Sequence, residues 1–455
     1  MGRSFLLLAT LSCARCAPGG DDSYSDTDAG SQGADSGQEL AARFEACVGG
    51  GCEVGLSCFT PTGRSGGTCT TICASDADCP ESVCAETDPR LCAQSCAADP
   101  SDCDEGTECG DVEGRPVCLG PVLPERHCFE GGAKLDLLFM VDDSNSMAQE
   151  QANLASNFSR LIDALVDPPD RNGDGWPDWE ALEDVHVGVV SSDLGTGGYV
   201  IRTCDDPVDG DGGELLHAGN TRMENCAEDY PTYLEGPSGR LASDFGCIAT
   251  LGTGGCGFEQ QLESVRRALV DRGQDANAGF LRPDSAVAIV LVTDEDDCSA
   301  SDPSIFDPDD DDLGVMNLRC FRHPEMITPV RAFVDAFLGL RETPDRLTVA
   351  AITGVPPELL ATYGGIFEAQ DFDEILAADE MQFVVDVDGE HLVRSCDVQG
   401  LGEAVPPRRI VEVLRDVAAE APGSAYLASI CTSDWTDTVE GLAASIGRSL
   451  CDPIE

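Results

Sequence analysis

The sequence predicts an α/β protein with a doubly wound, mainly parallel sheet, preceded by a small disulfide-rich repeat region. Two observations lead to this prediction. After Cys128, apolar segments of strand length alternate with segments in which apolar residues recur at helical spacing, the pattern of a parallel sheet covered on both faces. Between Cys47 and Cys118 there are twelve cysteines, and short cysteine-dense segments are held by disulfides more than by an apolar core.

The order of the expected elements defines the α/β unit. Residues 135–141 (LDLLFMV) form a largely apolar segment and therefore a buried strand. Residues 148–166 carry apolar side chains at helical spacing, which predicts an amphipathic helix. Further strands are expected at 185–191, 286–293, 347–353 and 426–430, and further helices at 258–271, 329–340, 409–420 and 436–450. Ligands of such sheets bind at the carboxyl ends of the strands, where the strand order reverses.

Charge and cysteine content restrict the function and the compartment. The chain has 84 acidic and 27 basic residues and a formal net charge of −57, which repels nucleic acid and anionic lipid and attracts divalent cations. Its 24 cysteines indicate disulfides formed in an oxidising compartment. We therefore expect an extracellular or cell-envelope protein with no nucleic-acid partner.

The first 46 residues are expected to serve export and attachment. Residues 1–17 are typical of a short signal peptide, and Cys13 lies in a setting that resembles a bacterial lipobox, although Thr10 stands where such boxes prefer leucine. Two alternatives follow, a lipid anchor at Cys13 and an exported chain without one. Residues 18–46 are rich in Gly, Ser and Asp and predict a flexible acidic linker. No later segment is long and apolar enough for a transmembrane helix.

Three consecutive four-cysteine units are expected over residues 47–118. The likeness of CASDADCPESVC to CAADPSDCDEGTEC indicates internal duplication. Four cysteines permit three pairings, so the connectivity within each unit stays open. The repeats serve either as a stiff spacer or as a ligand-binding stalk. The three sets are Cys47, Cys52, Cys58 and Cys69; Cys73, Cys79, Cys84 and Cys92; and Cys96, Cys103, Cys109 and Cys118.

A set of oxygen donors follows the first expected strand. Asp142, Ser144 and Ser146 fit the pattern DxSxS in the loop between that strand and the next helix. Carboxylate and hydroxyl oxygens are the ligands that hard divalent cations prefer. The pattern alone also fits a helix cap. The metal-site interpretation is strengthened because a second apolar strand ends in Thr293-Asp294, which supplies further oxygen donors.

In this setting the pattern resembles the von Willebrand factor type A family, over about residues 128–451. The resemblance implies a metal-ion-dependent adhesion site at which Asp142, Ser144, Ser146 and Asp294 hold Mg²⁺ or Mn²⁺. It also implies that a carboxylate from a protein ligand completes the metal shell. The expected function is therefore metal-dependent adhesion or protein binding, without catalysis.

Three points of this interpretation stay open. The family supplies a threonine ligand, for which Thr253 is the candidate, although helical register places Cys256 nearer to that position. The metal could also serve only to stabilise a structural envelope or matrix protein, or it could activate water in a hydrolase. The chain has no HExxH motif and no phosphate-binding GxxxxGK motif, which disfavours the enzyme.

A second cation site is expected at residues 170–178 (DRNGDGWPD). The alternating oxygen donors Asp170, Asn172, Asp174 and Asp178, with glycines between them, are typical of Ca²⁺ loops. Ala181 stands where a full EF-hand has a bidentate glutamate, and the segment resembles the calcium loops of dockerins and thrombospondin repeats more closely. A surface turn without metal is the alternative.

The ten cysteines from Cys128 onward are expected to form five disulfides. Short loops and domain boundaries favour these pairs, of which the last closes the α/β domain at its base. They are Cys204 with Cys226, Cys247 with Cys256, Cys298 with Cys320, Cys396 with Cys431, and Cys128 with Cys451.

Overall fold

The computed structural model describes most of the chain after residue 132. The described residues are 133–171, 177–361, 363, 367–398, 402–432 and 434–450, together with Cys96 and seven short strands before them. The predicted signal peptide, the acidic linker, Cys128 and Cys451 lie outside the described residues. In the part that is described, no helix combines the length and apolarity needed to cross a membrane.

The short strands of the cysteine-rich region form hairpins with a common register. In each of the three expected units, the third and fourth cysteines lie opposite each other on paired antiparallel strands, as Cys58 and Cys69 do. This shared register agrees with the internal duplication expected from the sequence. The strands are β1 (Ala46–Cys47), β2 (Ser57–Phe59), β3 (Gly67–Thr70), β4 (Val83–Ala85), β5 (Leu91–Ala93), β6 (Glu108–Val112) and β7 (Arg115–Leu119).

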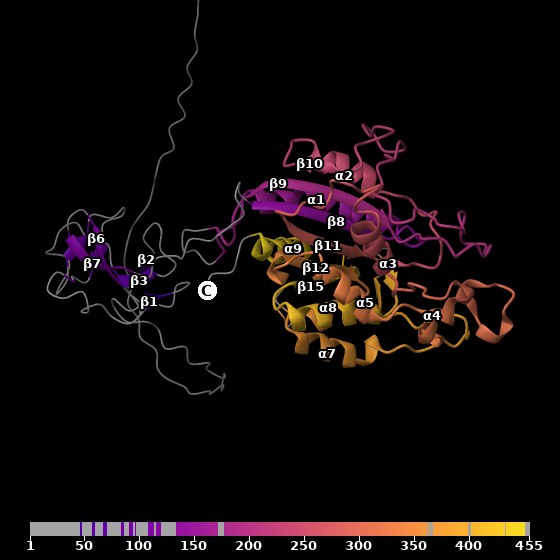
Figure 1. Cartoon of the computed structure of the whole chain (residues 1–455). Helices are drawn as coiled ribbons and strands as arrows, with labels where there is room; N and C mark the ends of the chain where they lie inside the picture. The colour runs from indigo at the N-terminus through magenta and orange to yellow at the C-terminus, as the bar shows by residue number, and fades with distance from the viewer. Residues whose placement is uncertain are drawn as a thin grey trace, which may run out of the picture. The chain divides into compact units, whose positions relative to one another are not determined.

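A six-stranded sheet forms the centre of the α/β domain (Figure 1). Its order is β10-β9-β8-β11-β12-β15, and only the edge strand β10 runs antiparallel to its neighbour. The expected mainly parallel α/β sheet is therefore confirmed. The strands are β8 (Ala133–Val141), β9 (Leu182–Ser191), β10 (Leu234–Gly236), β11 (Ala286–Val292), β12 (Leu347–Thr353) and β15 (Ala425–Ser429).

The central strands are buried on both faces, which explains their uninterrupted apolar sequences. Every residue of β11 and β12 is buried, and so is nearly all of β8. Strands β8 and β11 lie side by side, with Val141 opposite Val292. The segments that follow these two residues therefore leave the sheet at the same edge.

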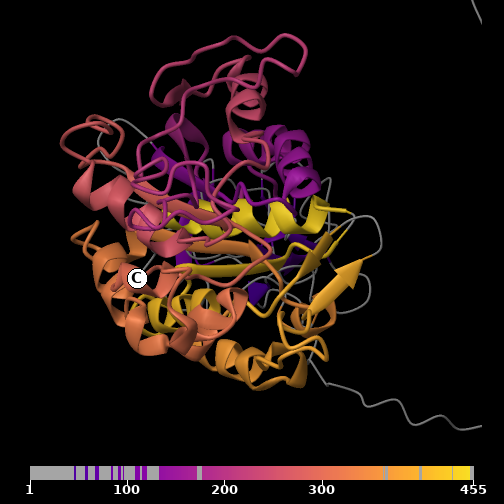
Figure 2. The same cartoon turned by 90° about the vertical axis from the view of Figure 1, so that its right-hand side faces the viewer.

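Two groups of helices cover the sheet, one on each face (Figure 2). The first group packs through an aromatic cluster in which the rings of Phe158 and Phe245 stack at 3.7 Å, next to Phe139 of β8. It consists of α1 (Ala148–Val166), α2 (Leu241–Ala249) and α9 (Thr436–Ser449). The second group consists of α3 (Gln261–Arg266), which continues as the π-helical turn η3 (Arg267–Asp271), α5 (Val330–Leu338), α7 (Ala369–Ala377) and α8 (Arg408–Glu420).

Two insertions extend from the domain, and each is anchored by a disulfide. The first follows β11 and is closed by Cys298–Cys320; it contains η4 (Pro303–Phe306), η5 (Asp311–Leu313), η6 (Met316–Leu318), α4 (Arg319–Arg322) and η7 (Pro324–Met326). The second contains η9 (Asp379–Met381) and the hairpin of β13 (Cys396–Val398) with β14 (Gly402–Ala404), and Cys396–Cys431 ties it to the end of β15. Both disulfides were expected from the sequence. The remaining short helices are η8 (Pro344–Arg346) and α6 (Pro357–Leu360).

Of the other three expected pairs, two are wrong, and Cys128 with Cys451 lies outside the described residues. The structure joins Cys204 to Cys256 and Cys226 to Cys247, instead of Cys204 to Cys226 and Cys247 to Cys256. The segment after β9 folds back along the loop before α3, where the Gly257 amide donates to the Thr203 carbonyl at 2.9 Å. This places the Cα atoms of Cys204 and Cys256 4.0 Å apart. The expected pairs were those that close the shortest loops in the sequence. The contact between the segments around Thr203 and Gly257 determines the disulfide pairing instead.

Candidate metal centre

The carboxyl edge of the sheet brings the sequence-predicted oxygen donors together. Asp142 follows β8 and Asp294 follows β11, and these strands are neighbours in the sheet. The Thr293 hydroxyl donates to Oδ2 of Asp142 at 2.6 Å, which joins the two strand ends directly. Asp142 is fully buried, and Asp294 is 3% exposed.

The DxSxS loop turns its side chains toward the same point. The Ser144 amide donates to Oδ1 of Asp142 at 2.8 Å. The hydroxyl oxygens of Ser144 and Ser146 are 3.3 Å apart, and Ser146 also hydrogen-bonds with the Asp294 carboxyl group. Two carboxylates and two hydroxyls thus converge, from two segments separated by about 150 residues in the chain.

The carboxylates of Asp142 and Asp294 are not neutralised by any basic side chain in the described part of the chain. No ion pair formed between described residues involves Asp142 or Asp294. Among the described side chains, Oδ1 of Asp294 and Oε2 of Glu150 are buried without a hydrogen-bond partner. Buried oxygen atoms of this kind are costly unless a partner satisfies them.

Burial and mutual repulsion raise the pKa values of these groups. Burial raises the pKa of Asp294 to about 8, with further contributions from the carboxylates of Asp142 and Glu295. Burial also raises the pKa of Asp142, although hydrogen bonds from Thr293 and Ser144 oppose that rise. A positive ion at this point would offset the repulsion and provide the missing partner.

Glu259 joins this acidic group and was missed in the sequence. It is 5% exposed in the segment before α3, and its pKa is raised well above the ordinary value by burial and by Glu295, Asp142 and Asp294. Its backbone is fixed because the Cys298 amide donates to the Glu259 carbonyl at 2.8 Å. The family resemblance marks the preceding segment, which contains Thr253, and no motif marks Glu259.

Gln151 braces the loop that contains Thr253. The buried side-chain amide of Gln151 donates to the carbonyls of Asp142 and Gly252 at 2.8 and 2.9 Å, and its oxygen accepts from the Gly252 amide at 3.0 Å. Thr253 itself is half-buried, and no hydrogen bond joins its side chain to another described residue. The loop therefore lies beside the donor set, but the Thr253 hydroxyl does not interact with it.

The donor set fits a hard divalent cation. Carboxylate and hydroxyl oxygens match the preference of Mg²⁺ and Mn²⁺, and the unpartnered Oδ1 of Asp294 offers a free lone pair at the point of convergence. Asp142, Ser144, Ser146 and Asp294 would hold such an ion, and Glu259 is placed to contribute a further negative charge. Among these groups only Asp142 and Asp294 provide carboxylates directly after neighbouring strands.

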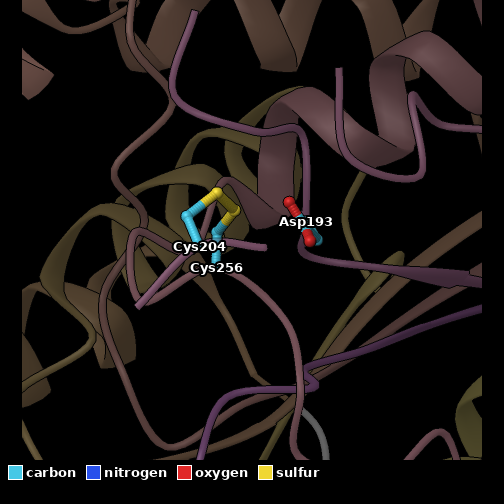
Figure 3. Close-up of side chains that lie close together, drawn as sticks. All are labelled: Asp193, Cys204 and Cys256. Carbon is cyan, nitrogen blue, oxygen red and sulfur yellow. A yellow bond between two sulfur atoms is a disulfide. The ribbon is translucent and has the colours of Figure 1, made fainter. Parts of the chain in front are cut away.

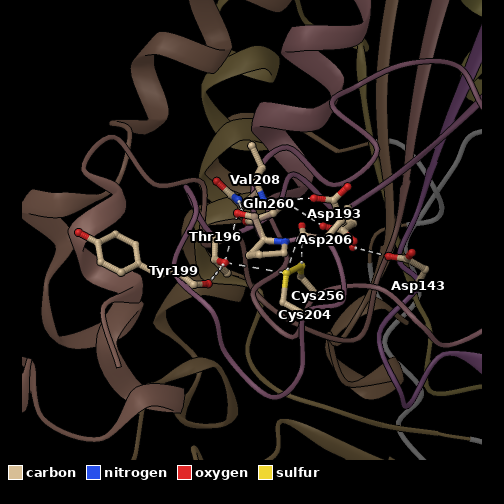
Figure 4. Close-up of a disulfide and its surroundings, with 12 residues drawn as sticks. Asp143, Asp193, Thr196, Tyr199, Cys204, Asp206, Val208, Cys256 and Gln260 are labelled. Atoms are coloured by element: carbon tan, nitrogen blue, oxygen red, sulfur yellow. Dashed lines mark hydrogen bonds between the residues drawn. A yellow bond between two sulfur atoms is a disulfide. The ribbon is translucent and has the colours of Figure 1, made fainter. Parts of the chain in front are cut away.

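A second cluster near this edge does not form a metal site. Asp193, Cys204 and Cys256 bring an oxygen and two sulfur atoms close together (Figure 3). The two sulfur atoms are bonded to each other as a disulfide, so neither is a thiolate that could bind metal. Asp193 is held by the Gly195 amide, which donates to it at 2.8 Å, while Thr196 donates to the Tyr199 carbonyl (Figure 4). This cluster stabilises the loop after β9.

The expected Ca²⁺ loop is described only at its two ends. Asp170 is exposed, and Asp178 accepts a hydrogen bond from the Arg171 amide at 3.3 Å and lies 4.0 Å from the Arg171 guanidinium. Asn172 and Asp174 lie outside the described residues. The Ca²⁺ loop therefore stays a prediction.

A cavity of about 1010 Å³ opens beside the donor set. Ser144, Ser146, Asp294 and Glu259 are among its lining residues, together with residues of the two disulfide-anchored insertions, of the segment 294–297 and of α8. A volume of this size is typical of protein sites that enclose a ligand. The candidate cation position is therefore reached from a defined hollow at the carboxyl edge of the sheet.

Comparisons with known proteins do not establish a family. No protein-family model and no curated protein matches the chain. Among solved structures, the chain is weakly similar to the pilus adhesin RrgA of Streptococcus pneumoniae, with 12% identity and a TM-score of 0.18. The match covers 67% of this chain and 39% of the adhesin, so the chain spans well under half of that protein's length. A TM-score this low carries no argument about fold or function.

Proposed function

We propose that this protein is an exported binding protein with a von Willebrand factor type A-like domain, which holds a protein ligand through a divalent cation. The observation that carries the proposal is the buried, unpartnered Oδ1 of Asp294 among carboxylates that raise its pKa. A divalent cation would offset this repulsion and supply the partner that Oδ1 lacks among the described residues. The four disulfides between described residues of the α/β domain fit an extracellular or cell-envelope location.

The chain's own residues account for the binding chemistry. Asp142 is fixed from three sides, by the Ser144 amide, the Thr293 hydroxyl and the Ser192 hydroxyl, so its carboxylate is pre-oriented. Asp294 and Ser146 hydrogen-bond to each other and line the cavity. A bound Mg²⁺ or Mn²⁺ would supply the positive charge that attracts a ligand carboxylate. The cavity leaves room for the ligand on the open side of the donor set.

Calorimetric titration with Mg²⁺, Mn²⁺ and Ca²⁺ tests the cation site. Because the net charge of −57 attracts cations everywhere, the chain should be compared with two variants in moderate salt. Asp294→Asn should abolish the saturable site, and Asp311→Asn, which removes an exposed carboxylate in the first insertion, should leave it intact. Equal titration curves for both variants would contradict the proposal.

Capture of a protein ligand tests the adhesive role separately. A carboxylate-bearing partner that binds in Mg²⁺ and is released by chelation supports adhesion. Saturable cation binding that only raises stability, with no Mg²⁺-dependent interaction in cell-envelope or matrix extracts, would indicate a structural metal instead.

A further inference from the structure

The cavity beside the cation site combines negative charge with apolar surface. Ten acidic side chains line it, against three arginines and one histidine. Apolar side chains from both insertions line it as well, among them Phe321, Ile327, Phe383 and Leu392. A ligand that matches such a lining carries positive charge on an apolar body.

Two aromatic rings connect the two insertions. Phe321 of the first insertion and Phe383 of the second meet edge to face, with ring centroids 5.1 Å apart. Both rings line the cavity and are half-buried. The Arg408 guanidinium lies 5.7 Å from the Phe383 ring centroid, so this ring already accepts one cationic group. Aromatic rings attract ammonium groups, and apolar surface packs against the aliphatic chains that carry them.

The arginines of the cavity are engaged within the chain. Arg409 pairs with Asp297 at 3.1 Å, and Arg394 pairs with Glu403 at 2.5 Å. Arg408 donates to two backbone carbonyls at 2.9 Å. Three arginines compensate for only part of the ten acidic side chains, so the cavity keeps an excess of carboxyl groups for a ligand.

Carboxyl groups without a basic partner lie on three different elements of the lining. Oδ1 of Asp294, directly after β11, is buried and has no hydrogen-bond partner among the described residues. Asp386 is exposed in the second insertion and forms no ion pair with a described arginine or lysine. Glu412 is half-buried on α8 and likewise forms no ion pair with a described residue. A ligand that pairs with all three needs several positive groups spaced along its length.

We infer that the cavity binds a linear polyamine, an aliphatic chain with three or four ammonium groups. One ammonium group pairs with Asp294 in the position proposed for the divalent cation, and the others pair with Asp386 and Glu412. The methylene groups pack along Phe321 and Phe383. Binding itself needs no metal. Its consequence, that a polyamine displaces the cation and thereby releases the protein ligand, rests on the proposed function.

Calorimetric titration of the complete chain in EDTA and moderate salt tests this inference. The probes are spermidine and hexaamminecobalt(III), which both carry three positive charges, although only spermidine has an aliphatic chain. Spermidine should fill one saturable site and bind about tenfold more tightly than the cobalt complex. A difference of this size corresponds to the burial of about two methylene groups against the rings.

Two double variants with the same change in charge locate the site. Asp386→Asn with Glu412→Gln should weaken spermidine binding at least about tenfold, because two charge-assisted contacts are lost. Asp311→Asn with Asp312→Asn removes two exposed carboxylates of the first insertion that are not part of the cavity lining, and it should change the affinity less than about twofold. Circular dichroism of each variant establishes that it is folded.

Two single variants test the parts of the site. Phe383→Leu, which keeps an apolar side chain there, should weaken the binding of spermidine more than that of hexaamminecobalt(III). Asp294→Asn in EDTA should weaken spermidine binding at least about threefold, because a charge-assisted contact becomes a neutral one. In the unsubstituted chain, spermidine should lower the apparent affinity for Mg²⁺.

The outcomes separate this inference from the proposed function. Equal affinities of the two probes, or equal effects of the two double variants, would overturn the inference, because they would show attraction to the net charge alone. Spermidine binding that Asp294→Asn leaves unchanged would overturn the placement of an ammonium group at the cation position. These titrations contain no free metal, so they are independent of the proposed function. Absence of saturable Mg²⁺ binding would contradict the proposed function alone, and a Mg²⁺ affinity that spermidine does not lower would contradict the displacement.

Discussion

Replacing Asp294 by asparagine should make the metal-free protein more stable while abolishing cation binding. The side chain is 3% exposed, its Oδ1 has no partner among the described residues, and burial with the carboxylates of Asp142 and Glu295 raises its pKa to about 8. An asparagine of the same shape is neutral in both the folded and the unfolded state, so its burial carries no cost of protonation. Its amide hydrogens can donate to the neighbouring carboxylates.

The magnitude follows from the difference between the folded and unfolded pKa. The ordinary value is 3.8, so at pH 7 the unfolded chain carries the charge, while the folded chain holds the proton. Over roughly three pH units this difference costs the folded state about 4 kcal/mol. The cost is shared with Asp142 and Glu295, so we expect the substitution to recover about 1–3 kcal/mol of it.

Chemical denaturation in EDTA and in excess Mg²⁺ measures this effect. In EDTA, Asp294→Asn should have the larger free energy of unfolding. In Mg²⁺ the unsubstituted chain should gain about 3 kcal/mol at a hundredfold excess over the dissociation constant, and the variant should gain nothing. A variant that is less stable than the unsubstituted chain in EDTA would refute the reasoning, because it would show that Asp294 stabilises the fold by itself.

Three further predictions concern other parts of the domain. Asp136→Asn should lower the free energy of unfolding by about 3 kcal/mol, because it weakens the buried contacts of Asp136 with Arg282 and Arg341; calorimetry should show unchanged Mg²⁺ affinity. Gln151→Leu removes one buried and two partly buried hydrogen bonds and should cost about 2–3 kcal/mol in urea denaturation, in EDTA and Mg²⁺ alike. In EDTA, the free energy of unfolding should fall as the pH rises from 5 to 8, by up to about 1.4 kcal/mol per pH unit for each of Asp143 and Asp294. The pKa values of both groups are raised to about 8, so the folded state holds protons that the unfolded state has lost. Saturating Mg²⁺ should flatten this slope, and a rising slope in EDTA would contradict the prediction.

The regular elements could be predicted where the local pattern was strong. The expected helix 148–166 agrees with α1 (Ala148–Val166), and the expected strand 347–353 agrees with β12 (Leu347–Thr353). The helix expected at 258–271 begins later, at Gln261, because Phe258 to Gln260 belong to the loop that packs beside the donor set. Both agreements rest on the pattern of apolar residues within one segment, which a sequence displays directly.

Elements stabilised by distant contacts were missed. Helix α2 (Leu241–Ala249) lies in a glycine-rich and cysteine-rich insertion, and its packing on α1 through Phe245 is not visible in its own short sequence. The exchange of partners between Cys204–Cys256 and Cys226–Cys247 has the same cause. Tertiary contacts determine the secondary structure and the disulfide pairing of such segments, and the spacing of cysteines in the sequence does not.

The candidate site, too, could be predicted only in part. Asp142, Ser144 and Ser146 were found because they lie within one loop, and Asp294 was found because a parallel sheet places neighbouring strand ends together. Glu259 was missed because its position depends on how residues 255–260 fold against β9 and the first insertion, where the Gln260 amide donates to the Ser192 carbonyl. No motif in the sequence marks that contact.

Strand β8 carries a buried aspartate, Asp136, near its start, and a second, Asp142, follows its end. The two carboxylates differ in their partners. At Asp136, burial raises the pKa, but Arg282 and Arg341 lie within 2.7 and 3.3 Å of its oxygen atoms and Ser285 donates to it. At Asp142, only uncharged groups donate. The chain has few basic residues and places two of them at one end of this strand, so it is able to neutralise a buried carboxylate from within. No described arginine or lysine pairs with Asp142 or Asp294 at the other end, which is the arrangement expected where the positive charge arrives from solution.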